Sequence, residues 1–248
     1  MMGLFKKKLP KSFFQGAGDV HCHLLPGVDD GFPTTEKSLA ALKVLENHGV
    51  ARMVLTPHFM KEYSDNDREH ITQVFAAFAD EAAKVCKIRL HVAGEYMLDS
   101  NFPNHFSQGF LTLDKGGNHV LCETSYMMYE HDAAGMLYEI MCEGYQPVIA
   151  HPERYEYAQK KDYFRWKDKD YEFQLNLLSL AGAYGGTAFA KSHYLLKEGY
   201  YDYVGSDMHN LDGFMRFASQ IKLDGKSIDK LGQLIENNKK LGDPSSME

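Results

Sequence analysis

Short apolar runs alternate with amphipathic segments along this chain, and this alternation constrains its fold more than any other feature. Seven runs read as buried strands, at residues 17–23, 51–58, 88–98, 118–125, 146–153, 172–180 and 201–207. Segments 34–49, 66–86 and 131–144 lie between them and carry apolar residues at helical spacing. Several β–α units of this kind predict an α/β fold with a parallel sheet, either closed as a barrel or doubly wound.

The chain reads as one domain. It has 248 residues, a length that α/β barrels commonly reach as a single domain. No stretch rich in Pro, Gly and Ser is long enough to act as a linker. We therefore expect one domain over residues 1–248, with a short basic segment at about residues 1–14. The helical pattern at residues 226–242 is expected either to cap the barrel or to join a partner subunit. The sequence therefore allows an oligomer as well as a monomer.

Charge and hydropathy exclude two classes of partner. Lys and Arg number 27 against 34 Asp and Glu, and the resulting net charge of −7 argues against nucleic-acid binding. No segment approaches the roughly 18 apolar residues that span a bilayer. Lys6, Lys7 and Lys8 allow at most peripheral contact with an anionic membrane, although a solvated tail is favoured. The four cysteines form no CxxC pair and are expected to be buried free thiols, as in a cytoplasmic protein.

Ligand-type side chains recur where the expected strands end. These residues are His21, His23, His58, Glu95, Glu123, His151, Asp207 and His209. In a parallel α/β barrel the carboxyl ends of all strands meet on one face, where active sites are built. Side chains that lie far apart in the sequence are therefore expected to converge in one cleft.

The chemistry of these side chains predicts a metal centre. Imidazole together with carboxylate suits divalent Mn, Fe or Zn, and several carboxylates favour more than one ion. His21 and His23 lie two residues apart on an extended strand, so they point the same way, and so do Asp207 and His209. A single histidine at a strand end usually packs as a structural residue, but five of them beside acids favour ligation. The other seven histidines are expected to be structural or on the surface.

The motifs resemble a known group. "DVHCH", "TPH", "HPER" and "SDMH" are similar to the motifs of the PHP (polymerase and histidinol phosphatase) superfamily. "HCHLLPGVDDG", "LTPH", "GEYML", "LCETSY", "IAHPERY" and "GSDMHN" resemble, more specifically, the manganese-dependent bacterial tyrosine-protein phosphatases of capsule and exopolysaccharide biosynthesis. The resemblance covers roughly residues 17–212. It implies a hydrolase with a distorted (β/α)7 barrel, up to three metal ions, and phosphotyrosine on a partner tyrosine kinase as substrate.

The resemblance also implies the site residues. The implied metal ligands are His21, His23, Asp30, His58, Glu95, Glu123, His151, Asp207 and His209. Arg154 corresponds to an arginine that contacts the substrate phosphate, and Arg154, Asp207 and His209 are the expected catalytic residues. Many members have a second arginine where Phe214 stands here, and Arg216 is the candidate replacement in substrate binding. Asp29 is the alternative to Asp30, because spacing does not separate them.

The expected reaction is hydrolysis of a phosphomonoester by metal-bound hydroxide, with Mn²⁺ as the implied ion and Fe, Zn, Mg or Co as alternatives. A cysteine-based tyrosine phosphatase is excluded, because no cysteine is followed by arginine at the required sixth position. Histidinol phosphate or another small phosphomonoester is the alternative substrate on the same scaffold. A non-catalytic, metal-stabilised binding module is the alternative of another class. Segments 95–110, 125–130 and 154–164 are candidate substrate walls, and ordinary packing accounts for their aromatic residues equally well.

Overall fold

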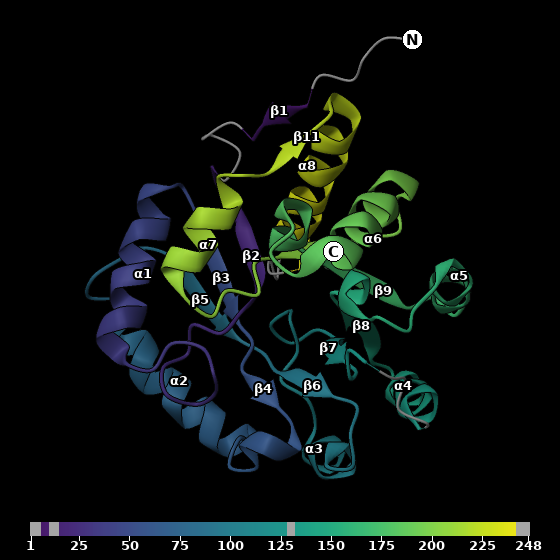
Figure 1. Ribbon diagram of the computed structural model, residues 1–248. Coiled ribbons are helices and arrows are strands. Elements are labelled where there is room, and N and C mark those ends of the chain that lie inside the picture. The colour runs from purple at the N-terminus through teal and green to yellow at the C-terminus, as the bar shows by residue number, and fades with distance from the viewer. Residues whose placement is uncertain (1–5, 10–14, 128–131, 242–248) are drawn as a thin grey trace.

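Parallel strands form the centre of the molecule (Figure 1). The computed structural model describes residues 6–9, 15–127 and 132–241. One sheet has the order β10-β9-β8-β7-β6-β4 and a second has the order β2-β3-β5, and the neighbours in both are parallel. The strands are β2 (Gly18–Cys22), β3 (Arg52–Leu55), β4 (His58–Phe59), β5 (Arg89–Val92), β6 (Glu95–Met97), β7 (His119–Glu123), β8 (Gln146–Ala150), β9 (Glu172–Asn176) and β10 (Tyr203–Gly205).

The two sheets join into a barrel. Strand β4 continues the path of β3 and β6 continues that of β5, so the described chain supplies seven strand positions. On the opposite side β2 meets the segment after β10, where the His23 amide donates to the Met208 carbonyl at 3.1 Å. The Asp207 amide likewise donates to the His21 carbonyl at 2.8 Å. The expected distorted (β/α)7 barrel is confirmed.

Two expected strands are interrupted, each for a local reason. Pro57 has no amide hydrogen, so it separates β3 from β4 within residues 51–58. Gly94 separates β5 from β6, and a Cβ atom there would lie only 2.7 Å from the ring of Tyr96. The expected strand at residues 172–180 was too long, because β9 ends at Asn176. The Asn176 side chain accepts a hydrogen bond from the Leu178 amide and starts a 3₁₀ turn.

Helices surround the barrel (Figure 1). They are α1 (Thr35–Asn47), α2 (Arg68–Ala82), α3 (Phe102–Gln108), α4 (Ala133–Cys142), α5 (Lys160–Asp168), α6 (Gly185–Glu198), α7 (Leu211–Ala218) and α8 (Gly225–Lys240). The 3₁₀ turns are η2 (Lys61–Tyr63), η3 (Pro152–Arg154) and η4 (Leu177–Ala181). In α1 the side chain of Thr34 caps the first turn, and of the three leucines at helical spacing Leu42 and Leu45 are buried and Leu39 is half-buried. Helices α3, α5, α6 and α7 had no prediction.

The last described helix packs at the seam between β2 and β10. Helix α8 lies against these strands, and the buried Asn238 amide donates to the carbonyls of Gly18 at 2.8 Å and Val204 at 2.6 Å. The helical pattern at residues 226–242 therefore covers the barrel. Strand β1 (Lys7–Lys8) pairs antiparallel with β11 (Lys222–Leu223), so Lys7 and Lys8 belong to a small ribbon rather than to a solvated tail. The rest of the expected basic segment lies mostly outside the described residues.

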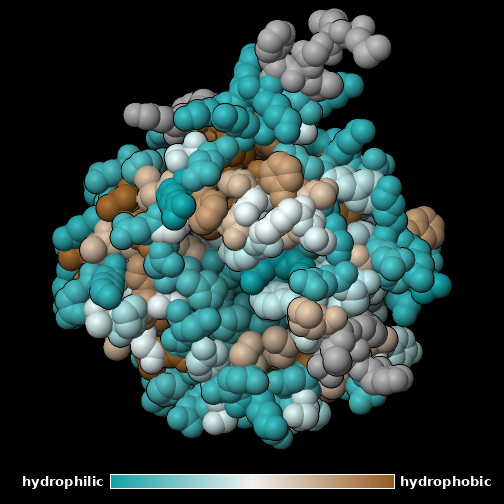
Figure 2. Space-filling model, viewed as in Figure 1, coloured by the Kyte–Doolittle hydropathy of each residue, from teal (hydrophilic) through white to brown (hydrophobic). Residues whose placement is uncertain are grey.

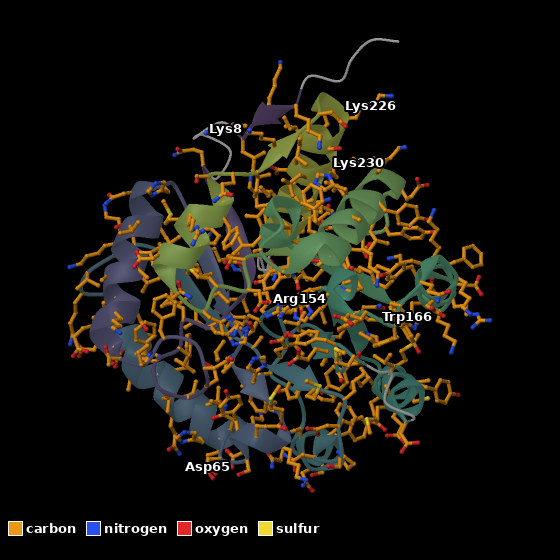
Figure 3. The ribbon with its side chains drawn as sticks, in the orientation of Figure 1. Lys8, Asp65, Arg154, Trp166, Lys226 and Lys230 are labelled. Atoms are coloured by element: carbon orange, nitrogen blue, oxygen red, sulfur yellow. The ribbon has the colours of Figure 1, made fainter. Side chains whose placement is uncertain are left out.

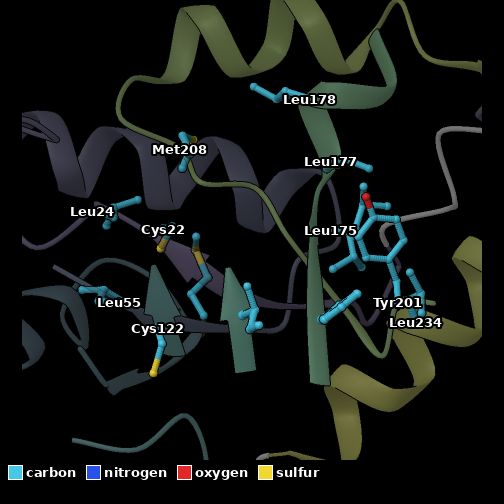
Figure 4. Close-up of a cluster of buried hydrophobic side chains, with 14 of the residues drawn as sticks. Cys22, Leu24, Leu55, Cys122, Leu175, Leu177, Leu178, Tyr201, Met208 and Leu234 are labelled. Carbon is cyan, nitrogen blue, oxygen red and sulfur yellow. The ribbon is translucent and has the colours of Figure 1, made fainter. Parts of the chain in front are cut away.

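Two groups of apolar side chains form the core. The larger lies between strands and helices, and Figure 4 shows part of it, including Cys22 of β2 and Leu55 of β3. The smaller consists mainly of strand residues, such as Leu121, that alternate with those of the larger group and fill the inside of the barrel. All four cysteines are free, but Cys142 is exposed and Cys86 is half-buried, so the expectation of buried thiols was wrong for these two.

Candidate metal centre

All nine implied ligands converge at the carboxyl ends of the strands. They form three groups in which the candidate ligand atoms lie within 4.8 Å of one another. The groups are His21, Glu95, His151 and Asp207; His58, Glu95 and Glu123; and His23, Asp30, His58 and His209. Glu95 belongs to two groups and His58 to two, so the three groups are contiguous.

Glu95 lies at the centre of this cluster. Its Oε2 atom is 3.2 Å from His21 Nε2, 3.2 Å from His23 Nε2 and 3.1 Å from His58 Nδ1. The Glu95 carboxylate is fully buried, as are the His21 and His23 side chains. One carboxylate oxygen that faces three imidazole nitrogens is the geometry of ligands directed at common ions, because separate ion pairs would place one nitrogen against each oxygen.

Unpartnered atoms test whether the residues fit a metal. Among the described residues, the buried atoms without a hydrogen-bond partner include His58 Nδ1, Glu95 Oε2, Glu123 Oε1 and His151 Nδ1. Buried polar atoms are nearly always paired, so a concentration of exceptions at one place requires a reason. A set of imidazole and carboxylate donors with such atoms fits divalent transition ions. The residues present therefore fit the group that the motifs predicted.

The electrostatics keep the carboxylates ionised, as ligation requires. Burial opposes ionisation of Glu95, but His21 and His58 hold its pKa well below the usual range. Asp207 has a lowered pKa for the same reason, since His21, His23 and Arg154 outweigh its burial. The hydrogen bond from His209 lowers the pKa of Asp30 to about 2. Burial and His23 oppose the protonation of His58, yet Glu95 and Glu123 raise its pKa to about 10.

Two of the implied ligands have a strained backbone. His151 has a φ of 35° and Asp207 a φ of 49°, and Asp170 is the one other non-glycine residue of the described chain with positive φ. Such conformations cost of order 1–3 kcal/mol and cluster at functional sites. The surrounding bonds hold them, since the amide of His151 donates to the Gln174 carbonyl and that of Asp207 to the His21 carbonyl, both at 2.8 Å.

The structure separates Asp29 from Asp30. Asp29 Oδ2 lies 2.8 Å from His23 Nδ1 and accepts the His58 amide at 3.2 Å, so Asp29 orients His23 from behind. The Asp30 carboxylate points the other way, with Oδ1 at 3.2 Å from His209 Nε2 and 3.5 Å from His58 Nε2. Asp30 therefore belongs to a group of candidate ligand atoms, whereas Asp29 orients a candidate ligand, His23.

Two supporting residues on β9 had no prediction. Gln174 Oε1 accepts a hydrogen bond from His21 Nδ1 at 2.9 Å, which fixes the ring of His21. Asn176 Nδ2 donates to Asp207 Oδ2 at 2.8 Å. The signal was present in "EFQLNLLSL", where Gln174 and Asn176 lie two apart in an apolar strand and so face the same side.

Arg154 lies over the centre of the barrel (Figure 3). It belongs to η3, directly after β8, and its Nη1 atom lies 2.5 Å from Asp207 Oδ2. Its guanidinium lies between two tyrosine rings, 4.3 Å from the centroid of Tyr126 and 4.2 Å from that of Tyr184. The two rings and the Asp207 carboxylate restrain the guanidinium, and Arg154 lines the hollows next to the cluster.

Arg216 lies apart from Arg154. It is exposed on α7, and its guanidinium lies 5.4 Å from the centroid of the Phe217 ring. It lines neither of the hollows next to the cluster, whereas Arg154 lines both. A substrate contact by Arg216 stays a prediction that this geometry does not favour.

One hollow opens directly above the cluster, and we call it the front hollow. Its lining residues are Asp30, His58, Met60, Glu62, Tyr63, Met97, Glu123, Tyr126, Arg154 and His209. Figure 2 shows the hydrophilic depression near the centre of this face. Each of the three expected wall segments contributes to it, through Met97, Tyr126 and Arg154, although residues 128–130 lie outside the described residues. The η2 turn, which supplies Tyr63, had no prediction.

Comparison with known proteins identifies the family. Residues 17–216 match the family model described as "Capsular polysaccharide synthesis, CpsB/CapC". The chain belongs to this family. The motifs indicated this membership.

Named relatives agree with this membership. The chain is 26% identical over 197 residues to the tyrosine-protein phosphatase YwqE of Bacillus subtilis, covering 78% of this chain and 77% of YwqE. It is 27% identical over 233 residues to the tyrosine-protein phosphatase CpsB of Streptococcus pneumoniae, covering 89% of this chain and 95% of CpsB.

A solved structure has the same fold. It comes from work on YwqE of Bacillus subtilis and CpsB of Streptococcus pneumoniae, described as unique metal-dependent tyrosine phosphatases. It superposes with a TM-score of 0.72 at 23% identity, over 90% of this chain and 93% of that chain. In the described part of this CpsB/CapC chain, no helix has both the length and the apolar character needed to cross a bilayer.

Proposed function

We propose that this CpsB/CapC member is a metal-dependent protein-tyrosine phosphatase that removes phosphate from a tyrosine-phosphorylated partner. The observation that carries the proposal is the single cluster of three ligand groups, joined through Glu95 and His58, with Arg154 at its edge. The proposed ions are Mn²⁺, up to three of them, held by the nine residues of these groups. A cytoplasmic tyrosine kinase of capsule or exopolysaccharide synthesis is the proposed partner.

The ions would supply the nucleophile, because divalent cations lower the pKa of bound water toward neutrality. The residues of this chain position the substrate. The front hollow receives the phosphotyrosine, with Arg154 holding non-bridging phosphate oxygens whose charge must be stabilised during transfer. Tyr126 and Tyr184 keep the guanidinium plane fixed while this contact forms.

Asp207 and His209 act beside Arg154. Asp207 stays ionised because its pKa is lowered, so it serves as a ligand and as the anchor of Arg154 rather than as a proton donor. Both nitrogens of His209 face oxygen atoms, Nδ1 at 3.0 Å from the Asp207 carbonyl and Nε2 at 3.2 Å from Asp30. The phenolate is a good leaving group, so the proposal needs no strong general acid.

The test compares two substrates and two metal states. Metal-free protein is assayed with a phosphotyrosine peptide and with histidinol phosphate, before and after Mn²⁺ is added. We expect Mn²⁺-dependent turnover that favours the phosphotyrosine peptide. Preference for histidinol phosphate would assign the protein to small-molecule metabolism, and inactivity on both would indicate a binding module.

Arg154→Ala tests the phosphate contact within the same assay. Removing one donor to a developing charge costs about 10²–10³ in kcat. Arg165→Ala is the matched control, because Arg165 is exposed on α5 and outside both hollows. A loss of equal size in Arg216→Ala would show that Arg216 reaches the substrate after all.

A further inference from the structure

A second hollow adjoins the metal centre, and we call it the side hollow. Its lining residues are Arg154, Leu178, Ala183, Tyr184, Asp207, Met208, His209, Asn210, Gly213, Phe214 and Phe217. Its volume is about 340 Å³. Arg154 and His209 line both hollows, so these two side chains form the boundary between them.

The walls of the side hollow differ in polarity. The charged or ionisable lining groups are Arg154, Asp207 and His209, which belong to the metal centre, and Tyr184, whose ring contacts Arg154. The opposite wall consists of Leu178, Ala183, Phe214 and Phe217 and carries no charge. Figure 2 shows apolar residues gathered above the central hydrophilic depression. A charged group placed against this wall would lose hydration without gaining a partner, whereas an apolar group would gain.

The apolar wall is fixed to the metal centre. Helix α7 begins directly after the segment that holds Asp207 and His209. The side chain of Asn210 caps it by accepting the Gly213 amide at 2.7 Å, and the Asn210 carbonyl accepts the Phe214 amide at 3.2 Å. Phe214 is 8% exposed and packs into the core. The distance between this wall and the phosphate position is therefore set by a short, hydrogen-bonded segment.

From these observations we propose that the side hollow binds an apolar side chain of the substrate, one that neighbours the phosphotyrosine in the partner's sequence. This inference rests on the proposed function, because it takes the front hollow as the place of the phosphotyrosine. A peptide that leaves the front hollow across Arg154 and His209 reaches the side hollow next. The site then selects apolar over acidic neighbours, and one well-filled apolar contact distinguishes substrates by about tenfold or more.

The experiment scans the neighbours of phosphotyrosine. The Mn²⁺-loaded protein is assayed with alanine-based phosphotyrosine peptides that carry a single Leu or a single Asp at each of the two positions on either side. Free phosphotyrosine is assayed alongside. We expect one position at which Leu exceeds Asp by about tenfold in kcat/KM. The Kd of the same peptides with a non-hydrolysable phosphonate, measured by calorimetry, should differ by the same factor.

Substitutions locate the effect in the side hollow. Phe217→Ala should reduce the Leu preference to about twofold and should lower kcat/KM for the Leu peptide more than for free phosphotyrosine. Phe217→Lys should reverse the preference toward Asp, because it places a cation on the uncharged wall. Phe164→Ala is the control, since Phe164 is 62% exposed on α5 and lines neither hollow. Its selectivity should match that of the unsubstituted protein.

The possible failures differ. Equal rates for Leu and Asp at every position would overturn the inference and leave the phosphatase proposal intact. An equal loss on free phosphotyrosine and on the Leu peptide in Phe217→Ala would also overturn it, because the side hollow would then hold the tyrosine ring itself. Inactivity of the unsubstituted, Mn²⁺-loaded protein on every phosphotyrosine compound would instead overturn the proposed function, provided that a cooperative thermal transition shows the protein to be folded.

Discussion

Histidines face carboxylates at both ends of the barrel, and the two arrangements differ in how many partners each atom has. At the amino end, His119 Nδ1 lies 3.0 Å from Asp114 and Nε2 lies 3.3 Å from Glu172. Each nitrogen there faces one acid. At the carboxyl end, the single Oε2 atom of Glu95 faces nitrogens from three histidines.

This difference teaches how to tell a structural ion pair from a ligand set. A protonated imidazole between two acids needs no metal ion, because each of its two N–H groups faces one carboxylate. At the carboxyl end four buried atoms without hydrogen-bond partners lie together, namely His58 Nδ1, Glu95 Oε2, Glu123 Oε1 and His151 Nδ1, whereas the amino-end pair has one, Glu172 Oε2. Residue type is the same at the two ends, and only the number of partners per atom distinguishes the site from the scaffold.

The sharpest test of the comparison replaces one acid at each end. Glu95→Gln keeps the shape but removes the charge shared by two ligand groups, so it should release bound Mn²⁺ and lower kcat/KM by at least about 10³-fold. Glu172→Gln changes an acid that faces one nitrogen at the amino end and should leave the Mn²⁺ content and kcat/KM unchanged. Metal analysis by mass spectrometry and phosphotyrosine kinetics check the pair. A Glu95→Gln protein that keeps its full metal content would contradict the view that only the carboxyl end is a set of metal ligands.

A smaller effect is expected from a residue that supports a ligand. Asp29→Asn keeps the size of the side chain but weakens the hold on His23 Nδ1, which should reduce Mn²⁺ affinity by about 10–100-fold. Competition with a metal-binding dye measures this change. Asp65→Asn is the control, because Asp65 is exposed and distant from the centre of the barrel (Figure 3). If Asp29→Asn binds Mn²⁺ as tightly as the control, Asp29 does not orient His23.

At the amino end of the barrel, the ion pairs of His119 are expected to affect the free energy of unfolding rather than activity. Burial opposes the protonation of His119, but Asp114 and Glu172 raise its pKa from 6.5 to about 9. Because the folded pKa is raised, the stabilisation is complete below pH 6.5 and is lost as the pH rises through about 9. The free energy involved is about 1 kcal/mol after solvent screening, equivalent to about 2–4 °C in Tm.

Calorimetry at several pH values checks this expectation. Unsubstituted protein should unfold at a higher temperature than His119→Gln at pH 6, and the difference should vanish by about pH 10. Activity at pH 7 should be the same in both, since His119 lies at the opposite end from the cluster. A Tm difference that does not change with pH would mean that His119 contributes through packing rather than charge.

Much of the site could be predicted because the signals are local. The β–α alternation predicted a parallel sheet, closed or doubly wound, and the resemblance of the motifs implied the barrel, in which every strand end comes to one face. His21, His58, Glu95 and Asp207 could therefore be grouped although up to 186 residues separate them along the chain. Polar residues two apart in an apolar strand also carried a signal at Gln174 and Asn176, which had no prediction.

Other features arose only from packing between segments that do not follow each other in the sequence. Spacing treats Asp29 and Asp30 alike, and the direction of each side chain was decided by the positions of His23, His58 and His209. The tyrosine rings around Arg154 come from two different segments, and Tyr184 belongs to none of the motifs, whereas Tyr126 ends the motif "LCETSY".

The sequence alone thus determined the parallel α/β sheet and which residue types gather at its carboxyl end, because strand periodicity and β–α order are properties of the chain itself. The tertiary structure decided which of two adjacent acids supports a ligand, how Arg154 is held, and where the uncharged wall of the side hollow stands. These features depend on distances between side chains brought together by folding, and such distances cannot be inferred from the spacing of residues along the chain.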